Sequence, residues 1–242
     1  MTTTQHRAPS VHADAAESVN ELSDLVRQLA GDNARSLTVF GRAVTPHFHK
    51  SRDDIRSVFV LEDMELTLLR TLAKHGPQLG KAGLRAPLIM TESYIQSSCD
   101  VFPLEFLEIQ QGYRVVFGPD SFAELPIRND DVRLQCEREI KSLLIGLRQG
   151  LLAAAGRDSL LTTIETEAGE SLIRTLRGLL YLKEDREPGT AAELLSRAER
   201  ITGKTLNGVR TSIDSGARHG WEEFVPLYKD LEVLGGLIDA WS

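Results

Sequence analysis

The chain is poor in cysteine and contains no long apolar run. Its two cysteines, Cys99 and Cys136, lie far apart in the sequence and have no paired histidine nearby. We interpret them as reduced, partly buried thiols rather than as a disulfide or a metal site. No uncharged apolar run approaches the roughly 18–20 residues that span a bilayer, and no basic and then apolar segment opens the chain. We therefore expect a cytoplasmic protein with no membrane partner.

The sequence also lacks an excess of basic residues. Lys and Arg number 28 against 35 Asp and Glu, which gives a net charge of -7 over 242 residues, and the acidic excess is spread over both halves. A dedicated DNA or RNA binder needs a basic surface for the phosphates, so the sequence gives no strong nucleic-acid signal and argues against a dedicated binder. What the chain does have is a 41% hydrophobic share, which is enough for a buried core in one large or two small domains.

The apolar pattern divides the chain into three parts. Residues 1–13 show no periodicity and are predicted to be a disordered tail. Residues 14–128 alternate helical spacing with β-prone runs, and residues 129–242 show helical spacing alone. We predict a domain with a mixed sheet over 14–128 and a helical bundle over 129–242. The predicted strands are Leu37–Phe40, Ile55–Leu61, Ala86–Met90, Pro103–Ile109 and Tyr113–Phe117.

Capping signals place several of the predicted helices. Asp63 is expected to cap a helix that reaches Leu79, and Thr91 is expected to start a short one. Thr190 with Glu193 forms a capping box. Pro226 suits the first turn of the last helix. The other predicted helices cover residues 15–29, 132–151, 160–179 and 205–213.

One constellation carries the functional information. An apolar strand ends at Gly41-Arg42, a loop of about a dozen residues follows, and Asp54-Ile55-Arg56 leads into a second apolar strand. Two further acidic residues stand in Pro103-Leu104-Glu105-Phe106-Leu107-Glu108, and the stretch Arg114–Asp120 follows them.

These residues resemble the nucleotidyltransferase superfamily with the DNA polymerase β-like fold, in particular small bacterial members with a helical C-terminal domain. The resemblance implies an α+β fold: a nucleotidyltransferase-like mixed β-sheet flanked by helices, followed by an all-α bundle. In that family a strand ends in Gly-Ser, Asp-x-Asp enters the next strand, and a later strand supplies a third carboxylate. Gly41-Arg42 stands in the Gly-Ser place and Asp54-Ile55-Arg56 in the Asp-x-Asp place.

The resemblance also implies roles for single residues. Asp54 and Glu105 are the candidate catalytic residues and metal ligands, with Glu108 as the alternative to Glu105 on the opposite face of a regular strand. Gly41, Arg42 and Arg56 are the candidate nucleotide-binding residues. The implied ligand is a nucleoside triphosphate, and the implied cofactor of an active enzyme is Mg²⁺.

The chemistry explains why the family concentrates carboxylates. Transfer of a nucleotidyl group builds negative charge on the α-phosphate and on the departing pyrophosphate, and two Mg²⁺ ions stabilise both sides of the displacement. Two hard cations need several carboxylate oxygens in a small space. Asp-x-Asp on a strand puts both side chains on one face.

Arg56 departs from this pattern, because a guanidinium stays protonated and cannot ligate a metal. Asp53 could restore the pattern only by a shift of register, and an odd shift moves the side chain to the other face. We therefore hypothesise that Arg56 pairs with Asp54 and Glu105, where the metal would stand.

Two weaker motifs have ordinary explanations. His47 and His49 lie two residues apart without a third ligand in sequence, so we interpret this segment as a solvated or phosphate-facing loop rather than a metal site. Gly203-Lys204-Thr205 resembles the end of a phosphate-binding loop, but the first glycine is missing and no strand precedes it. A turn between two helices explains it better.

Three functions remain open from the sequence. The first is a pseudoenzyme with a degenerate metal site that binds nucleotide or regulates. The second is an active nucleotidyltransferase that modifies a small molecule or a protein. The third is a helical interaction module on an inactive scaffold, in which an apolar stripe of the bundle forms a homodimer or a groove for a partner.

Overall fold

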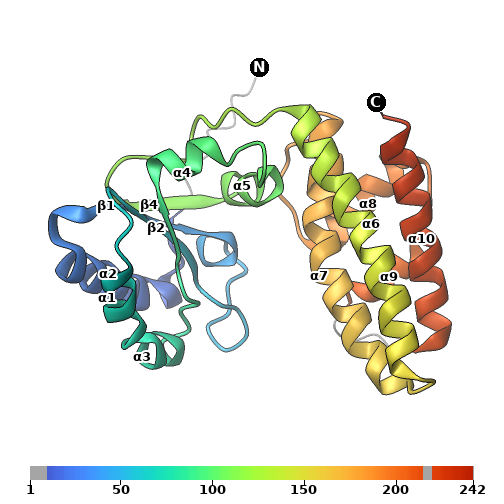
Figure 1. Cartoon of the computed structure of the whole chain (residues 1–242), viewed down its shortest axis with the longest axis horizontal. Helices are drawn as coiled ribbons and strands as arrows, with labels where there is room; N and C mark the ends of the chain where they lie inside the picture. Colours follow the sequence, from blue (N-terminus) through green and yellow to red (C-terminus); the bar gives the residue numbers. More distant parts are fainter. Residues whose placement is uncertain (1–9, 215–219, 242) are drawn as a thin grey trace. The chain divides into compact units, whose positions relative to one another are not determined.

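The structure is a computed structural model that describes residues 10–214 and 220–241. Their contacts define two compact units (Figure 1). The sheet unit contains the described residues up to Cys99 together with Glu108–Pro126, and the helical unit contains Asp100–Leu107 together with the described residues from Ile127 onward. The sequence predicted a single boundary near residue 128 and did not anticipate that Asp100–Leu107 groups with the later helices. Most of the predicted tail lies outside the described residues.

A mixed four-stranded sheet forms the centre of the sheet unit. Strand β1 (Ala34–Phe40) pairs antiparallel with both β2 (Arg56–Leu61) and β4 (Tyr113–Phe117), and β2 pairs parallel with β3 (Leu88–Thr91). The strand order is β3-β2-β1-β4. The register places Phe40 opposite Arg56 on one side and opposite Tyr113 on the other.

Five helices and two short turns accompany the sheet. Helix α1 (Ala13–Ala30) buries one face, which includes Val19, Leu22 and Val26. Helix α4 (Glu92–Ser97) begins as predicted, because the Thr91 hydroxyl accepts the N–H of Tyr94. The remaining elements are η1 (Gly31–Asn33), η2 (Gly41–Val44), α2 (Leu66–Ala73), α3 (Gly76–Lys81) and α5 (Pro103–Gln110).

The structure corrects two predictions in this region. The helix expected from Asp63 to Leu79 is two helices, because Pro77 lacks the N–H that a continuous helix would bond to the Ala73 carbonyl. The strand expected at Pro103–Ile109 is helix α5. Its apolar residues are buried on several sides, and a short apolar run of that kind has no periodicity that separates a strand from a buried helix. Those buried residues are Leu104, Phe106, Leu107 and Ile109.

The helical unit contains α6 (Asn129–Ala154), α7 (Asp158–Leu182), α8 (Ala191–Thr202), α9 (Asn207–Ser212) and α10 (Trp221–Asp239). The leucine and isoleucine stripes predicted from the sequence fill its core. The capping box of Thr190 and Glu193 is present at the start of α8. Gly203, at a φ of +65°, ends that helix and confirms the turn between helices.

Pro226 does not open the last helix, contrary to the prediction. Helix α10 begins five residues earlier, at Trp221, and Phe224 is buried in the extra turn. Burial of that aromatic ring outweighs the hydrogen bond that Pro226 cannot donate.

Both cysteines are free and buried, as expected for reduced thiols. Burial raises the pKa of the Cys136 thiol to about 12. Within the described residues, no helix has the length and apolar character needed to cross a membrane.

Candidate functional site

Arg56 and Glu108 form the best-defined polar contact of the sheet unit. Arg56 Nη1 lies 2.7 Å from Glu108 Oε1, and Nη2 lies 3.2 Å from Oε2, so the guanidinium donates two parallel hydrogen bonds to the carboxylate. The side chains are largely withdrawn from solvent, with exposed fractions of 33% and 13%. The Arg56 guanidinium also lies over the Phe40 ring, 4.5 Å from its centroid. The register explains this contact, because Phe40 is the cross-strand neighbour of Arg56.

This pair is the kind of contact hypothesised from the sequence, but its carboxylate differs from the expected ones. Arg56 engages Glu108, which the sequence offered as the alternative to Glu105. In a helix, residues 105 and 108 are neighbours one turn apart rather than on opposite faces. The prediction of opposite faces was therefore wrong together with the predicted strand.

Glu105 belongs to the helical unit. Its Oε2 accepts a hydrogen bond from Gln135 Nε2 at 2.8 Å, and its Oε1 lies 3.5 Å from Arg174 Nη1. Gln135 in turn accepts the N–H of Leu104 at 2.9 Å. Glu105 is thus part of a small polar network around the start of α5. The expected proximity of Asp54 and Glu105 stays a prediction.

The loop after β1 is organised around Gly41. Its φ of +76° is in the left-handed region that favours glycine. The N–H of Gly41 donates to the Gly112 carbonyl at 3.0 Å and joins the end of β1 to the residue before β4. Arg42 follows with a half-exposed side chain, which donates to the His47 carbonyl at 3.4 Å.

Two adjacent carboxylates in this loop have different roles. Asp53 is 10% exposed and accepts the N–H of His49 at 2.8 Å, with the Nε atoms of Arg42 and Arg52 at 3.8 and 3.7 Å. Asp53 therefore closes the loop. Asp54 is exposed, and its side chain makes no hydrogen bond or ion pair with the described residues.

The donor set does not fit a pair of Mg²⁺ ions. Among residues 10–214 and 220–241, no three His, Cys, Asp or Glu side chains gather where they could hold a metal. One candidate ligand position is a guanidinium, and both oxygens of Glu108 face it. His47 and His49 are exposed on either side of the buried Phe48.

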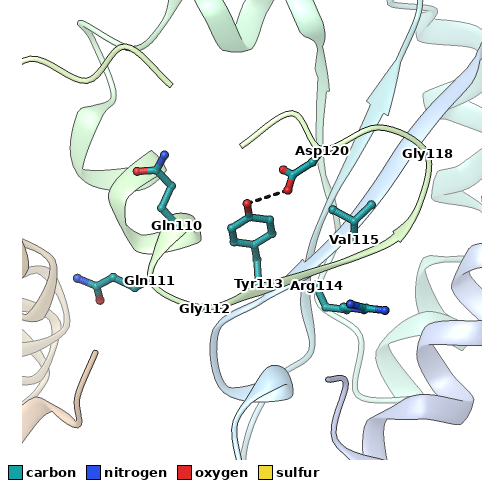
Figure 2. A pocket seen from close by; sticks show the side chains of 8 residues that line it. All are labelled: Gln110, Gln111, Gly112, Tyr113, Arg114, Val115, Gly118 and Asp120. Carbon is teal, nitrogen blue, oxygen red and sulfur yellow. Dashed lines mark hydrogen bonds between the residues drawn. The ribbon is translucent and has the colours of Figure 1, made fainter. Parts of the chain in front are cut away.

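A cavity of about 530 Å³ lies beside β4 in the sheet unit (Figure 2). Tyr113 donates its hydroxyl to Asp120 Oδ2 at 2.9 Å within it. Burial, the hydrogen bond and the charge of Asp120 together raise the pKa of Tyr113 to about 12. A second cavity of about 320 Å³ shares Arg114 and Val115 with the first. The sequence drew attention to the stretch Arg114–Asp120 but gave no sign of this cavity or of the contact between Tyr113 and Asp120, for which Gly118-Pro119-Asp120 was the available turn signal.

The mixed sheet flanked by helices and the helical part that follows it define an α+β, nucleotidyltransferase-like fold. No family model matches the sequence, and no curated protein matches it either. Among solved structures, the chain is similar to spectinomycin adenyltransferase AAD(9) from Enterococcus faecialis, described with ATP and spectinomycin. The TM-score is 0.58 at 12% identity, over 93% of this chain and 99% of that chain. At this identity the similarity shows the fold alone.

Proposed function

We propose that this protein uses a nucleotidyltransferase-like fold to bind a nucleoside triphosphate without metal-dependent transfer, as a regulatory or nucleotide-sensing protein. The observation that carries the proposal is the Arg56–Glu108 pair, which stands where the resemblance expects a metal-binding carboxylate. The neighbouring adenyltransferase is described with ATP, which supports a triphosphate as the ligand.

Arg56 opposes a two-metal site through its charge and through its contacts. It removes one carboxylate ligand, and it adds a permanent positive charge that repels a divalent cation. It also occupies both oxygens of Glu108, the nearest carboxylate in the sheet unit. These effects act in one direction, so Mg²⁺ binding is weakened while an anion beside the guanidinium is stabilised.

The same loop contains two arginine side chains whose positive charge suits a polyphosphate. Arg42 and Arg52 are exposed by 52% and 66%, and their Nε atoms share the single carboxylate of Asp53. Two guanidinium groups on one carboxylate leave an excess positive charge. Phosphate oxygens suit the fork of an arginine side chain.

An active nucleotidyltransferase is the second candidate, and one observation favours it. Asp54 is exposed and makes no hydrogen bond or ion pair with another described side chain, so its carboxylate is available to a single metal ion. In that case Asp54 would act as a ligand of Mg²⁺.

Calorimetric titration with ATP and GTP tests the proposal, with Mg²⁺ or with a chelator present. The wild-type affinity should change by less than about threefold between the two conditions, whereas Arg56→Asp should make binding depend on Mg²⁺ by about tenfold or more. Arg35→Asp is the matched control, since Arg35 is also an arginine of the sheet paired with a glutamate, Glu62. Circular dichroism checks that each variant is folded, and Arg56→Leu removes the cation without adding a charge.

Labelled nucleoside triphosphates separate the two candidates. Each one is incubated with Mg²⁺ or Mn²⁺, and pyrophosphate release and labelling of the protein are measured. We expect neither. Robust release by the wild type that Asp54→Ala abolishes would overturn the proposal in favour of an active enzyme.

A further inference from the structure

Helix α6 exposes a row of large aliphatic side chains. Leu134, Ile145 and Leu152 have exposed fractions of 46%, 54% and 81%. They are separated by 11 and 7 residues, which are close to whole numbers of helical turns, so they share one face. Figure 1 shows α6 as one of the long helices of the helical unit.

This exposed face is not needed to build the bundle. The core of the helical unit contains a different set of α6 residues, each of which is at most 2% exposed. They are Val132, Cys136, Ile140, Leu147 and Ala154. The exposed row is therefore a second apolar surface on the same helix, and truncating it leaves the core intact.

Most of the charges on this face are positive, and its acidic residue, Asp130 in the first turn of α6, is paired with Arg128 at 3.5 Å. At 100° per residue, Arg138, Lys141 and Arg148 fall within the same arc as the aliphatic row. Lys141 is shared between Glu137 and Asp239, which border the arc. The Arg148 Nε donates to the Tyr228 hydroxyl, which is neutral, at 2.6 Å. Arg138 makes no contact with a described acidic side chain. Arg138 and Arg148 therefore leave an uncompensated positive charge.

Charge argues against a second copy as the occupant of this face. In an antiparallel pair of α6 helices, Leu134 meets Leu152 of the copy when the two-fold axis passes at Leu143, halfway between positions 134 and 152. Positions 138 and 148 have the same midpoint, so that register sets Arg138 against Arg148. Like charges placed opposite each other destabilise a helix pair.

We propose that this face of α6 binds an amphipathic helix of a partner protein that carries acidic residues beside an aliphatic stripe. The partner's aliphatic side chains pack on Leu134, Ile145 and Leu152. Its carboxylates pair with Arg138 and Arg148, which gives the contact its specificity. The proposal does not depend on nucleotide binding by the sheet unit.

Fluorescence anisotropy with the full chain tests this surface. The probe is a labelled 20-residue helical peptide with leucines at spacings of 7 and 11 flanked by glutamates, and the comparison peptide has lysines in place of the glutamates. The acidic peptide should bind at least about tenfold more tightly. Arg138→Glu with Arg148→Glu should reverse that preference, and Arg200→Glu, an exposed arginine of α8, should leave it unchanged.

The aliphatic row is tested with Ile145→Ser and Leu152→Ser together. This variant should weaken the acidic peptide by about tenfold or more, whereas Leu66→Ser, at a side chain 76% exposed in the sheet unit, should have no effect. Circular dichroism checks folding. Equal affinity for the two peptides, or binding that survives the double substitution, overturns the proposal. A dimer in light scattering that the same substitution dissociates assigns the face to a second copy and also overturns it.

Discussion

Two regions of this chain hold their elements together by different means: the strand ends around Arg56 in the sheet unit and the junction of α9 with α7 and α10 in the helical unit. In the sheet unit, side chains join the ends of neighbouring elements: the Arg56 guanidinium lies over the Phe40 ring and binds the Glu108 carboxylate. Where α9 meets its neighbouring helices in the helical unit, the closest approaches involve glycines, as they also do in the sheet unit at Gly118, whose Cβ would lie 2.1 Å from the Arg35 carbonyl oxygen. A Cβ on Gly208 would lie 2.1 Å from the backbone N of Leu227, and one on Gly169 would lie 2.2 Å from the Ser212 carbonyl oxygen.

The difference determines which of the two regions can change its chemistry without losing its fold. A polar pair depends on the complementarity of two side chains, so a change on one side can be offset by a change on the other. A glycine contact depends on backbone atoms, which no side-chain substitution moves out of the way. This explains how the sheet unit keeps its fold with an arginine in a place where the resemblance expects a carboxylate.

Substitution of Gly208 tests the rigid side of this comparison and should have the largest effect. In Gly208→Ala the new methyl group would meet the backbone of Pro226 and Leu227 at 2.1 to 2.4 Å, so α9 and α10 must separate. Overpacking of a core costs about 1–3 kcal/mol even where side chains can adjust, and here the obstacle is backbone. We expect a loss of about 3 kcal/mol or more in the free energy of unfolding, measured by urea denaturation.

Gly236 is the matched control for Gly208. It lies within α10, and a Cβ there would meet nothing within 4 Å. Gly236→Ala should therefore raise the free energy of unfolding by about 0.5–1 kcal/mol, because alanine favours the helix. A similar loss in both variants, or none in Gly208→Ala, would show that the glycine contacts do not limit the helical unit.

The adaptable side of the comparison is tested by a double-mutant cycle on Arg56 and Glu108. Arg56→Leu and Glu108→Gln each leave a partly buried charged or polar group without its bidentate partner. The combined variant should lose less than the two single variants together. The expected coupling is about 1–2 kcal/mol in the free energy of unfolding, below the value of a fully buried pair because Arg56 is one-third exposed.

A second cycle on Arg35 and Glu62 serves as the reference. This pair belongs to the same unit, but its side chains are more than half exposed and its atoms are 3.6 Å apart. Exposed pairs couple by about 0–1 kcal/mol. If the Arg56–Glu108 cycle gives no more than this reference, the pair does not organise the strand ends.

The sequence predicted those elements whose signals are local. Strand β4, the start of α4 at Thr91 and the capping box at Thr190 each depend on residues within a few positions. Helix α5 could not be predicted in this way. Its short apolar run is buried by contacts that come from distant parts of the chain, and burial decides between strand and helix.

The candidate site shows the same limit. The spacing of Gly41, Arg42 and Arg56 around one loop was visible in the sequence, and so was the suggestion that Arg56 pairs with a carboxylate. The choice of Glu108 was not, because the two residues are 52 positions apart and the turn of a helix, rather than the pleat of a strand, orients Glu108. Asp53 and Asp54 are chemically alike in sequence, and only the closed loop separates their roles.

The smallest effect is expected at Tyr113, where the sheet unit uses one more pair of side chains. The pKa of Tyr113 is raised to about 12 from an ordinary value of 10.0, first by burial and then by the hydrogen bond to Asp120 and its charge. The folded state therefore favours the neutral phenol. Its stabilising contribution is complete below pH 10, where the unfolded chain is also neutral, and is lost as the pH rises through about 12.

Asp120→Asn should lower the pKa of Tyr113 toward its ordinary value, because it removes the negative charge beside the hydroxyl. The asparagine oxygen can still accept the N–H groups of Phe122 and Ala123, which Asp120 Oδ1 now accepts, so the turn should persist and the stability should fall by only about 1 kcal/mol. Phenolate absorbance during a pH titration measures the shift, and Tyr113→Phe identifies its signal among the four tyrosines. A wild-type signal that titrates near pH 10 and does not move in Asp120→Asn would mean that this pair contributes nothing to the edge of the sheet.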